Sequence, residues 1–158
     1  MIAPKGRYPV NLKQVLDPST IVLNLAGTSK KAVIDELLDL LVRAGKLVQR
    51  ADALRAVLER EAKMSTAIQN GVAIPHAKSD AVSSLVTAIG LKPLGVDFES
   101  LDGQPTRIFI MTLSPQTRVG PHIQFLSAIS QSLDKEPVRN ALLRAKTPQD
   151  VIDILTAG

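Results

Sequence analysis

The sequence predicts a single α/β domain. Short segments rich in β-branched residues alternate with segments of helical periodicity, no internal repeat or low-complexity linker divides the chain, and 158 residues are enough to bury one core. A composition of 45% hydrophobic and 22% charged residues is typical of a folded globular chain. Residues 1–10 hold two prolines and no apolar period, so we expect a flexible leader at 1–10 and the domain at 11–158.

The first elements expected are one strand and two helices. Residues 21–25 form a short run rich in β-branched residues, which favours a strand. Thr28 or Ser29 is expected to cap a helix that ends at Gly45, because hydroxyl side chains cap helix starts and glycine follows helix ends. A second apolar stripe of helical period predicts a helix over 51–63.

The middle of the chain predicts three strands. Residues 72–74 are apolar and end at Pro75, which cannot donate a ladder hydrogen bond. Two longer strands are expected at 85–91 and 107–113, with a turn at Asp102–Gly103 between them. The last of the three is almost wholly apolar, which indicates a central strand buried on both faces. The hairpin-like order of these segments predicts a mixed sheet.

The remainder of the chain is expected to be helical. A helix should begin at Gly120–Pro121 with proline at its first position, where a missing N–H costs nothing. Two shorter helices are expected at about 137–145 and 147–157. The first of these three helices should turn one stripe toward the sheet, made of His122, Leu126, Ile129 and Leu133.

Composition excludes several classes of function. The chain has no cysteine, which excludes a disulfide framework, a thiolate metal site and a cysteine nucleophile, and it fits a reducing compartment. With three Phe, one Tyr and no Trp, it lacks stacking platforms for single-stranded nucleic acid, and its net charge of +4 is spread without a dense basic run. We find no apolar run long enough for a membrane span or a signal peptide. These features predict a soluble cytoplasmic protein that binds no nucleic acid.

The two histidines are the candidates for chemistry. His76 follows an apolar strand, where a loop can present its ring, and an imidazole with a pKa near 6.5 is largely neutral at pH 7 and nucleophilic. His122 should lie near a helix N-terminus, whose free N–H groups attract anions such as phosphate. The alternatives are a surface or core histidine that fills space, for His76, and a ring that donates to backbone at a helix start, for His122.

Other chemistries find no pattern in the sequence. The two histidines are 46 residues apart, which matches no zinc spacing, and no carboxylate can be nominated as a further ligand. The chain contains no Gly-x-Ser-x-Gly motif, no Walker loop and no Gly-x-Gly-x-x-Gly motif. We therefore expect no metal and no cofactor.

A larger pattern surrounds His76. The stretch from Arg60 to His76 holds an Arg-Glu pair, a Ser-Thr pair and the run Gly-Val-Ala-Ile-Pro-His, and the segment 108–115 is followed by His122 and Leu126. With these blocks at these spacings, the chain resembles the type-2 enzyme IIA domains of the bacterial phosphoenolpyruvate-dependent phosphotransferase system, the fructose/mannitol and nitrogen-regulatory class. The resemblance spans roughly residues 11–157.

The resemblance implies a fold and a role for each site residue. The fold would be a mixed sheet between helices. His76 would accept a phosphoryl group, on Nε2, from an HPr-like histidine phosphocarrier protein, His122 would hydrogen-bond that group, and Arg60 would supply positive charge. The alternative for Arg60 is an ion pair with Glu61 or Asp52.

The branch of the family is less determined than the site. Ser29-Lys30-Lys31, together with a chain read as a stand-alone domain, resembles the nitrogen-regulatory branch, so we expect a regulatory protein whose phosphorylation controls its binding to target proteins. The alternatives are a fructose/mannitol-type component that relays phosphate to a IIB component, and an unphosphorylated structural domain. Many members carry glycine where this chain has Ala67 and Ala77, which removes backbone freedom near His76.

Overall fold

A mixed sheet of five strands runs through residues 11–157, the part of the chain that the computed structural model describes. The central strand β5 (Thr106–Ser114) pairs antiparallel with β4 (Val86–Val96). On its other side it pairs in parallel first with β2 (Val72–Ala73) and then with β3 (His76–Lys78), and β1 (Ile21–Val22) lies parallel to β4. The predicted leader at 1–10 lies outside the described residues, as does residue 158.

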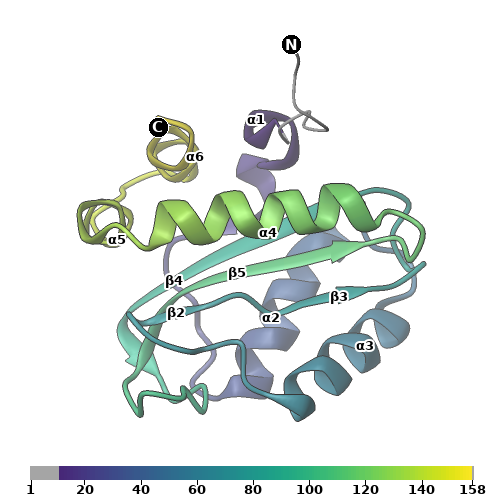
Figure 1. Cartoon of the computed structure of the whole chain (residues 1–158), viewed down its shortest axis with the longest axis horizontal. Coiled ribbons are helices and arrows are strands. Elements are labelled where there is room, and N and C mark those ends of the chain that lie inside the picture. The colour runs from purple at the N-terminus through teal and green to yellow at the C-terminus, as the bar shows by residue number, and fades with distance from the viewer. Residues whose placement is uncertain (1–10, 158) are drawn as a thin grey trace.

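Helices cover both faces of the sheet (Figure 1). One face carries α2 (Lys30–Arg43) and α3 (Arg50–Lys63), and the other carries α4 (Val119–Leu133) with α5 and α6. The strand β5 alternates between two cores, since Phe109 and Met111 pack with the first helix pair and Ile108 and Ile110 with the second group. The remaining elements are α1 (Leu12–Val15), the 3₁₀ turn η2 (Pro18–Thr20), α5 (Glu136–Leu143) and α6 (Pro148–Thr156).

Most elements lie where the sequence predicts them. The Ser29 hydroxyl caps α2 by accepting from the Ala32 N–H, and Gly45 follows the helix with a φ of +74°, a left-handed conformation that favours glycine. The expected turn at Asp102–Gly103 joins β4 to β5, and β5 is the buried central strand. The prediction of an α/β domain with a mixed sheet between helices is confirmed.

Three local predictions are wrong. The strand expected at 21–25 contains only Ile21–Val22, because the η2 turn precedes it and the chain then bends at residues 23–24. The helix expected to start at Gly120–Pro121 starts at Val119, so Pro121 occupies its third position, where the N–H is also free of an intrahelical bond. Its buried stripe contains Phe125 in place of Leu126.

Candidate functional site

His76 lies at the start of a strand rather than in the loop that the sequence suggested. It is the first residue of β3 and pairs with Thr112 of β5, while Pro75 donates nothing and offers its carbonyl oxygen to the Thr112 N–H at 2.9 Å. The half-buried ring holds its Nδ1 2.8 Å from the Ile74 carbonyl oxygen. A carbonyl oxygen only accepts, so Nδ1 carries the hydrogen and the lone pair of the ring is on Nε2.

His122 lies beside His76, as the family resemblance implies. The two ring centroids are 5.6 Å apart, with the ring planes tilted by 54°. His122 is in the first turn of α4, only 3% exposed, and its Nδ1 lies 2.7 Å from the Ser114 hydroxyl at the end of β5. The pair therefore joins the carboxyl end of the central strand, a neighbouring parallel strand and the start of a helix.

Both rings are held neutral at pH 7. Burial lowers the pKa of His76 below 6.5, and the hydrogen bond to Ile74 opposes that effect in part. The nearby Arg60 lowers the pKa of His76 further, whereas Glu61 raises it. Burial, with smaller contributions from His76 and Lys78, lowers the pKa of His122 to about 4. Because both imidazoles are neutral, they can lie close together without electrostatic repulsion, and each can make hydrogen bonds.

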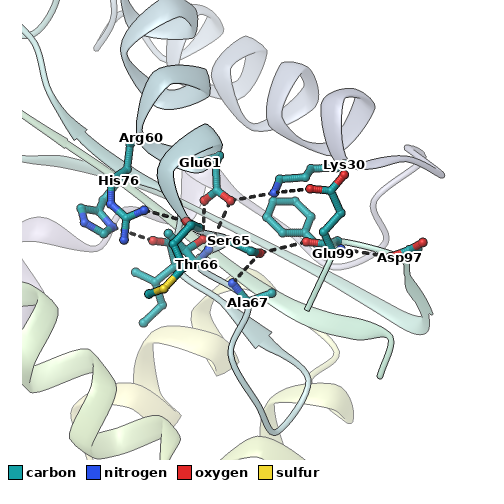
Figure 2. Close-up of polar contacts among 12 residues, drawn as sticks. Lys30, Arg60, Glu61, Ser65, Thr66, Ala67, His76, Asp97 and Glu99 are labelled. Atoms are coloured by element: carbon teal, nitrogen blue, oxygen red, sulfur yellow. Dashed lines mark hydrogen bonds and ion pairs between the residues drawn. The ribbon is translucent and has the colours of Figure 1, made fainter. Parts of the chain in front are cut away.

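Arg60 projects from the last turn of α3 next to His76 (Figure 2). Its Nη1 donates to the carbonyl oxygen of Met64 at 2.7 Å, which ties the guanidinium to the segment leaving the helix. The alternative of an ion pair with Glu61 or Asp52 is not what the structure holds: the ion pairs of Glu61 and Asp52 are made by Lys30 and Arg55. Among residues 11–157, the bond to Met64 is the one hydrogen bond that the Arg60 guanidinium makes.

A buried polar network behind Arg60 escaped the sequence reasoning. The Glu61 carboxylate, in a residue 6% exposed, accepts from the Thr66 N–H at 3.2 Å and from the Thr66 hydroxyl, and it pairs with Lys30 Nζ at 2.9 Å (Figure 2). The Ser65 hydroxyl donates to the Phe98 carbonyl oxygen at 3.0 Å. The Arg-Glu and Ser-Thr pairs thus form one hydrogen-bonded unit that fixes the segment between α3 and β2. The presence of these two pairs was the one feature of the sequence that could have indicated this network.

The two alanines that replace family glycines cause no strain. Ala77 lies in β3, and Ala67 makes an antiparallel bridge with Ala73, so both have extended surroundings. Among residues 11–157, the non-glycine residues with positive φ are Asn70 and Glu99. Because neither alanine needs a left-handed conformation, the presentation of His76 does not depend on glycine there.

The described residues also bear on two expected absences. Within 11–157, no three His, Cys, Asp or Glu side chains lie together in a way that could hold a metal ion. In the same part of the chain, none of the helices has the length and apolar character needed to cross a membrane.

Comparison with known proteins points in one direction. Residues 14–158 match the family model described as "Phosphoenolpyruvate-dependent sugar phosphotransferase system, EIIA 2". The chain is 43% identical over 147 residues to a fructose-specific EIIA component from Haloferax volcanii, covering 89% of this chain and 96% of the relative. It is 30% identical over 146 residues to a nitrogen regulatory protein from Pseudomonas aeruginosa, covering 92% of this chain and 95% of the relative. A fructose-specific EIIABC component from Bacillus subtilis is 39% identical over 146 residues, and the chain spans 23% of its length.

Solved structures agree in fold. The nitrogen regulatory protein IIA-Ntr from Neisseria meningitidis superposes with a TM-score of 0.84 at 30% identity, covering 90% of this chain and 97% of that one. The mannitol IIA of Escherichia coli superposes with a TM-score of 0.75 at 24% identity, covering 89% and 99%, and this likeness concerns the fold alone.

Proposed function

Because this chain belongs to the EIIA 2 family of the phosphoenolpyruvate-dependent sugar phosphotransferase system, we propose that it is a phosphocarrier that accepts a phosphoryl group on Nε2 of His76 from an HPr-like phosphohistidine protein. The observation that carries this proposal is the hydrogen bond from His76 Nδ1 to the Ile74 carbonyl oxygen. It places the ring lone pair on Nε2 and prevents the ring from turning, so that a single nitrogen can act as nucleophile.

The transfer balances without a proton leaving either protein. The Nε2 lone pair of His76 forms a bond to phosphorus while the phosphorus–nitrogen bond of the donor breaks. The donor ring, which carries a hydrogen on its other nitrogen, leaves as a neutral imidazole, and the positive charge passes to the His76 ring, which keeps its hydrogen on Nδ1. The low pKa of His76 keeps its lone pair available at neutral pH. Negative charge spreads over three phosphoryl oxygens in the transition state, and catalysis consists mainly of meeting that charge in a fixed geometry.

Arg60 and His122 are the groups proposed to meet this charge. Arg60 is a permanent cation held beside His76 by its bond to Met64. His122 is buried, neutral and 5.6 Å from His76 between ring centroids, so one N–H can reach a phosphoryl oxygen. Both donors are in place before the reaction, which is how electrostatic stabilisation is most effective.

The surface beside the pair suits a protein donor. Four large apolar side chains from the segments that carry the site are exposed by 43–57%: Met64, Ile68, Val119 and Ile123. A phosphoryl group on a carrier's histidine is delivered only if two protein surfaces meet, and exposed apolar side chains supply contact area for such an encounter. A structure of E. coli mannitol IIA in complex with phosphorylated IIB has been solved, and we propose a IIB component as the acceptor here.

We place the relay toward fructose-type sugar uptake ahead of the regulatory role. Identity is 43% and 39% to two fructose-specific components, against 30% to the nitrogen regulatory proteins of Pseudomonas and Neisseria. Lys30, which favoured the regulatory branch from sequence, makes ion pairs with Glu61 and Glu99 and so has a structural role. The regulatory role stays the second candidate because the Neisseria protein superposes well, with a TM-score of 0.84.

The experiment is phosphorylation in a purified system. The protein is incubated with labelled phosphoenolpyruvate, the first enzyme of the system and the phosphocarrier, and the wild type should take up one acid-labile phosphate per chain while His76→Ala takes up none. Equal labelling of His76→Ala would reject the site. A fructose-type IIB component is then added: rapid loss of label from this protein supports the relay, and retention of label contradicts it.

Arg60 is tested with a matched pair of variants on the same helix. Arg60→Gln should take up label ~10²-fold more slowly, because one preorganised donor to the developing charge is lost. Arg55→Gln removes an exposed arginine that pairs with Asp52 and should react as the wild type does. Equal rates for the two variants would show that Arg60 is not part of the transfer.

A further inference from the structure

We propose that Ser114 is a positioning residue that fixes the tautomer of His122, so that His122 presents a hydrogen on Nε2 to the phosphoryl group; this inference rests on the proposed function of His76. Ser114 is the last residue of β5 and is fully buried. Its backbone is held by β3, the strand that begins with His76, through the pairing of Lys78 with Ser114 and a 2.8 Å bond from the Ser79 N–H to the Ser114 carbonyl oxygen. The hydroxyl is therefore a fixed point for the His122 ring.

The direction of the Ser114–His122 hydrogen bond follows from the partners available. Among the described residues, the Ser114 hydroxyl bonds only to His122 Nδ1, at 2.7 Å. If Nδ1 carried the hydrogen and donated it, the hydroxyl hydrogen of Ser114 would be buried without an acceptor. If the hydroxyl donates instead, both groups are satisfied. The hydroxyl therefore donates, Nδ1 accepts, and the ring hydrogen of neutral His122 is on Nε2.

The Nε2 atom of His122 is not sealed inside the protein. Across residues 11–157 no protein group bonds Nε2 of His122. If this atom were also sealed from solvent, it would be a buried polar atom without a partner, but among these residues Thr106 Oγ1 is the one such side-chain atom. Nε2 therefore keeps access to solvent although the residue is 3% exposed. Its ring is neighbour to His76, so the group that can fill this access is a phosphoryl oxygen on His76.

The two histidines then have opposite tautomers, so that Nε2 carries a lone pair in His76 and a hydrogen in His122. A backbone carbonyl takes the Nδ1 hydrogen of His76 and leaves a lone pair on its Nε2. A serine hydroxyl gives a hydrogen to Nδ1 of His122 and leaves an N–H on its Nε2. The first nitrogen attacks phosphorus and the second donates to its oxygens. With the other tautomer of His122, a lone pair would face the phosphoryl oxygens and repel them.

The tautomer can be read directly by NMR. The chain has two histidines, so ¹⁵N-histidine labelling gives two ring systems, and His76→Ala assigns them. Long-range ¹H–¹⁵N spectra at pH 7 distinguish a ring nitrogen with a hydrogen from one with a lone pair. We expect His122 to show a lone pair on Nδ1 and a hydrogen on Nε2 in the wild type. The reverse pattern in the wild type overturns the inference without any variant.

Three serine variants add the cause. Ser114→Ala should move the His122 nitrogen shifts toward a mixture of tautomers, and Ser114→Thr, which keeps the hydroxyl, should restore them. Ser79→Ala removes another buried serine hydroxyl, one that accepts from the Ala81 N–H, and should leave the His122 shifts in place. Unchanged His122 shifts in a folded Ser114→Ala protein would overturn the inference.

The rate of phosphorylation gives the functional readout. Ser114→Ala should take up label ~10-fold more slowly than the wild type, the lower end of what is lost when the hydrogen-bond partner that orients a metal-bound imidazole is removed. Ser79→Ala should match the wild type. If Ser114→Ala is labelled at the wild-type rate, Ser114 does not contribute to transfer through the tautomer of His122, and its proposed role as a positioning residue is wrong. If no variant, including the wild type, is labelled at all, the proposed function fails, and the NMR pattern still decides the tautomer.

Discussion

The start of β3 and the first turn of α4 each present one histidine, and the two places differ in exposure and in what holds the ring. His76 is half-buried and is held by a main-chain carbonyl two residues before it. His122 is 3% exposed and is held by a side chain from another element. A ring that must be reached by a partner protein needs an open face, whereas a ring that only donates a hydrogen bond works best where water is excluded.

The same contrast appears in the charges around each ring. His76 has a cation and an anion beside it, Arg60 and Glu61, with opposite effects on its pKa. The pKa of His122 is lowered by burial and by His76 and Lys78, all in one direction, to about 4. The charges of Arg60 and Glu61 therefore oppose each other in their effect on the pKa of His76, whereas all the effects on His122 favour its neutral form.

The largest effect is expected from removing His122, the proposed hydrogen-bond donor, while keeping His76, the proposed phosphoryl acceptor. His122→Ala should still be labelled on His76, but ~10²- to 10³-fold more slowly, because one preorganised donor to the developing charge is lost. Rapid-quench labelling measures the rate. His122→Asn, which offers an amide N–H, should recover part of it. If His122→Ala reacts as fast as the wild type, the two regions do not work together in transfer.

The next effect concerns stability and isolates the buried ring. With a folded pKa of about 4 and an unfolded value of 6.5, His122 stabilises the fold fully above pH 6.5, and this contribution is lost as the pH falls toward 4, because the unfolded chain takes up the proton first. Between pH 7 and 4.5 the wild type should lose about 2–3 kcal/mol more than His122→Gln. Urea unfolding followed by circular dichroism measures this, since the chain has no Trp. Parallel losses in the two proteins would mean that His122 titrates normally in the fold.

The sequence predicted the elements that rest on local chemistry. The Ser29 cap, the Gly45 stop and the largely apolar, buried β5 are each determined by residues within one or two turns or one strand, and all three are as predicted. The errors lie where tertiary contacts decide. The side of α4 that buries Phe125 rather than Leu126 depends on how the helix crosses the sheet, which helical period alone does not give.

The site was foreseen as three residues, and the structure adds what holds them. His76, His122 and Arg60 could be named from a motif with fixed spacing, and the two rings do lie together. The partners that orient them come from separate places: the Ile74 carbonyl, the Ser114 hydroxyl and the Glu61–Lys30 pair. A carbonyl is invisible in a sequence, and a serine or glutamate is too common to be assigned a partner without coordinates.

Glu61→Gln should give the smallest effect and the sharpest contrast between the two regions. Glutamine keeps an oxygen for Thr66 but loses the charge that pairs with Lys30. Lys30 keeps its ion pair with the exposed Glu99 at 3.3 Å, so the free energy of unfolding should fall by about 1–2 kcal/mol. The ¹⁵N shifts and titration of His76 should change, because Glu61 raises the pKa of that ring, while the His122 shifts should not. Glu59→Gln, an exposed position on the same helix, is the control and should change neither. If the shifts of both histidines change in Glu61→Gln, the two rings share one electrostatic environment. The conclusion that His76 and His122 are oriented and tuned by separate groups would then be wrong.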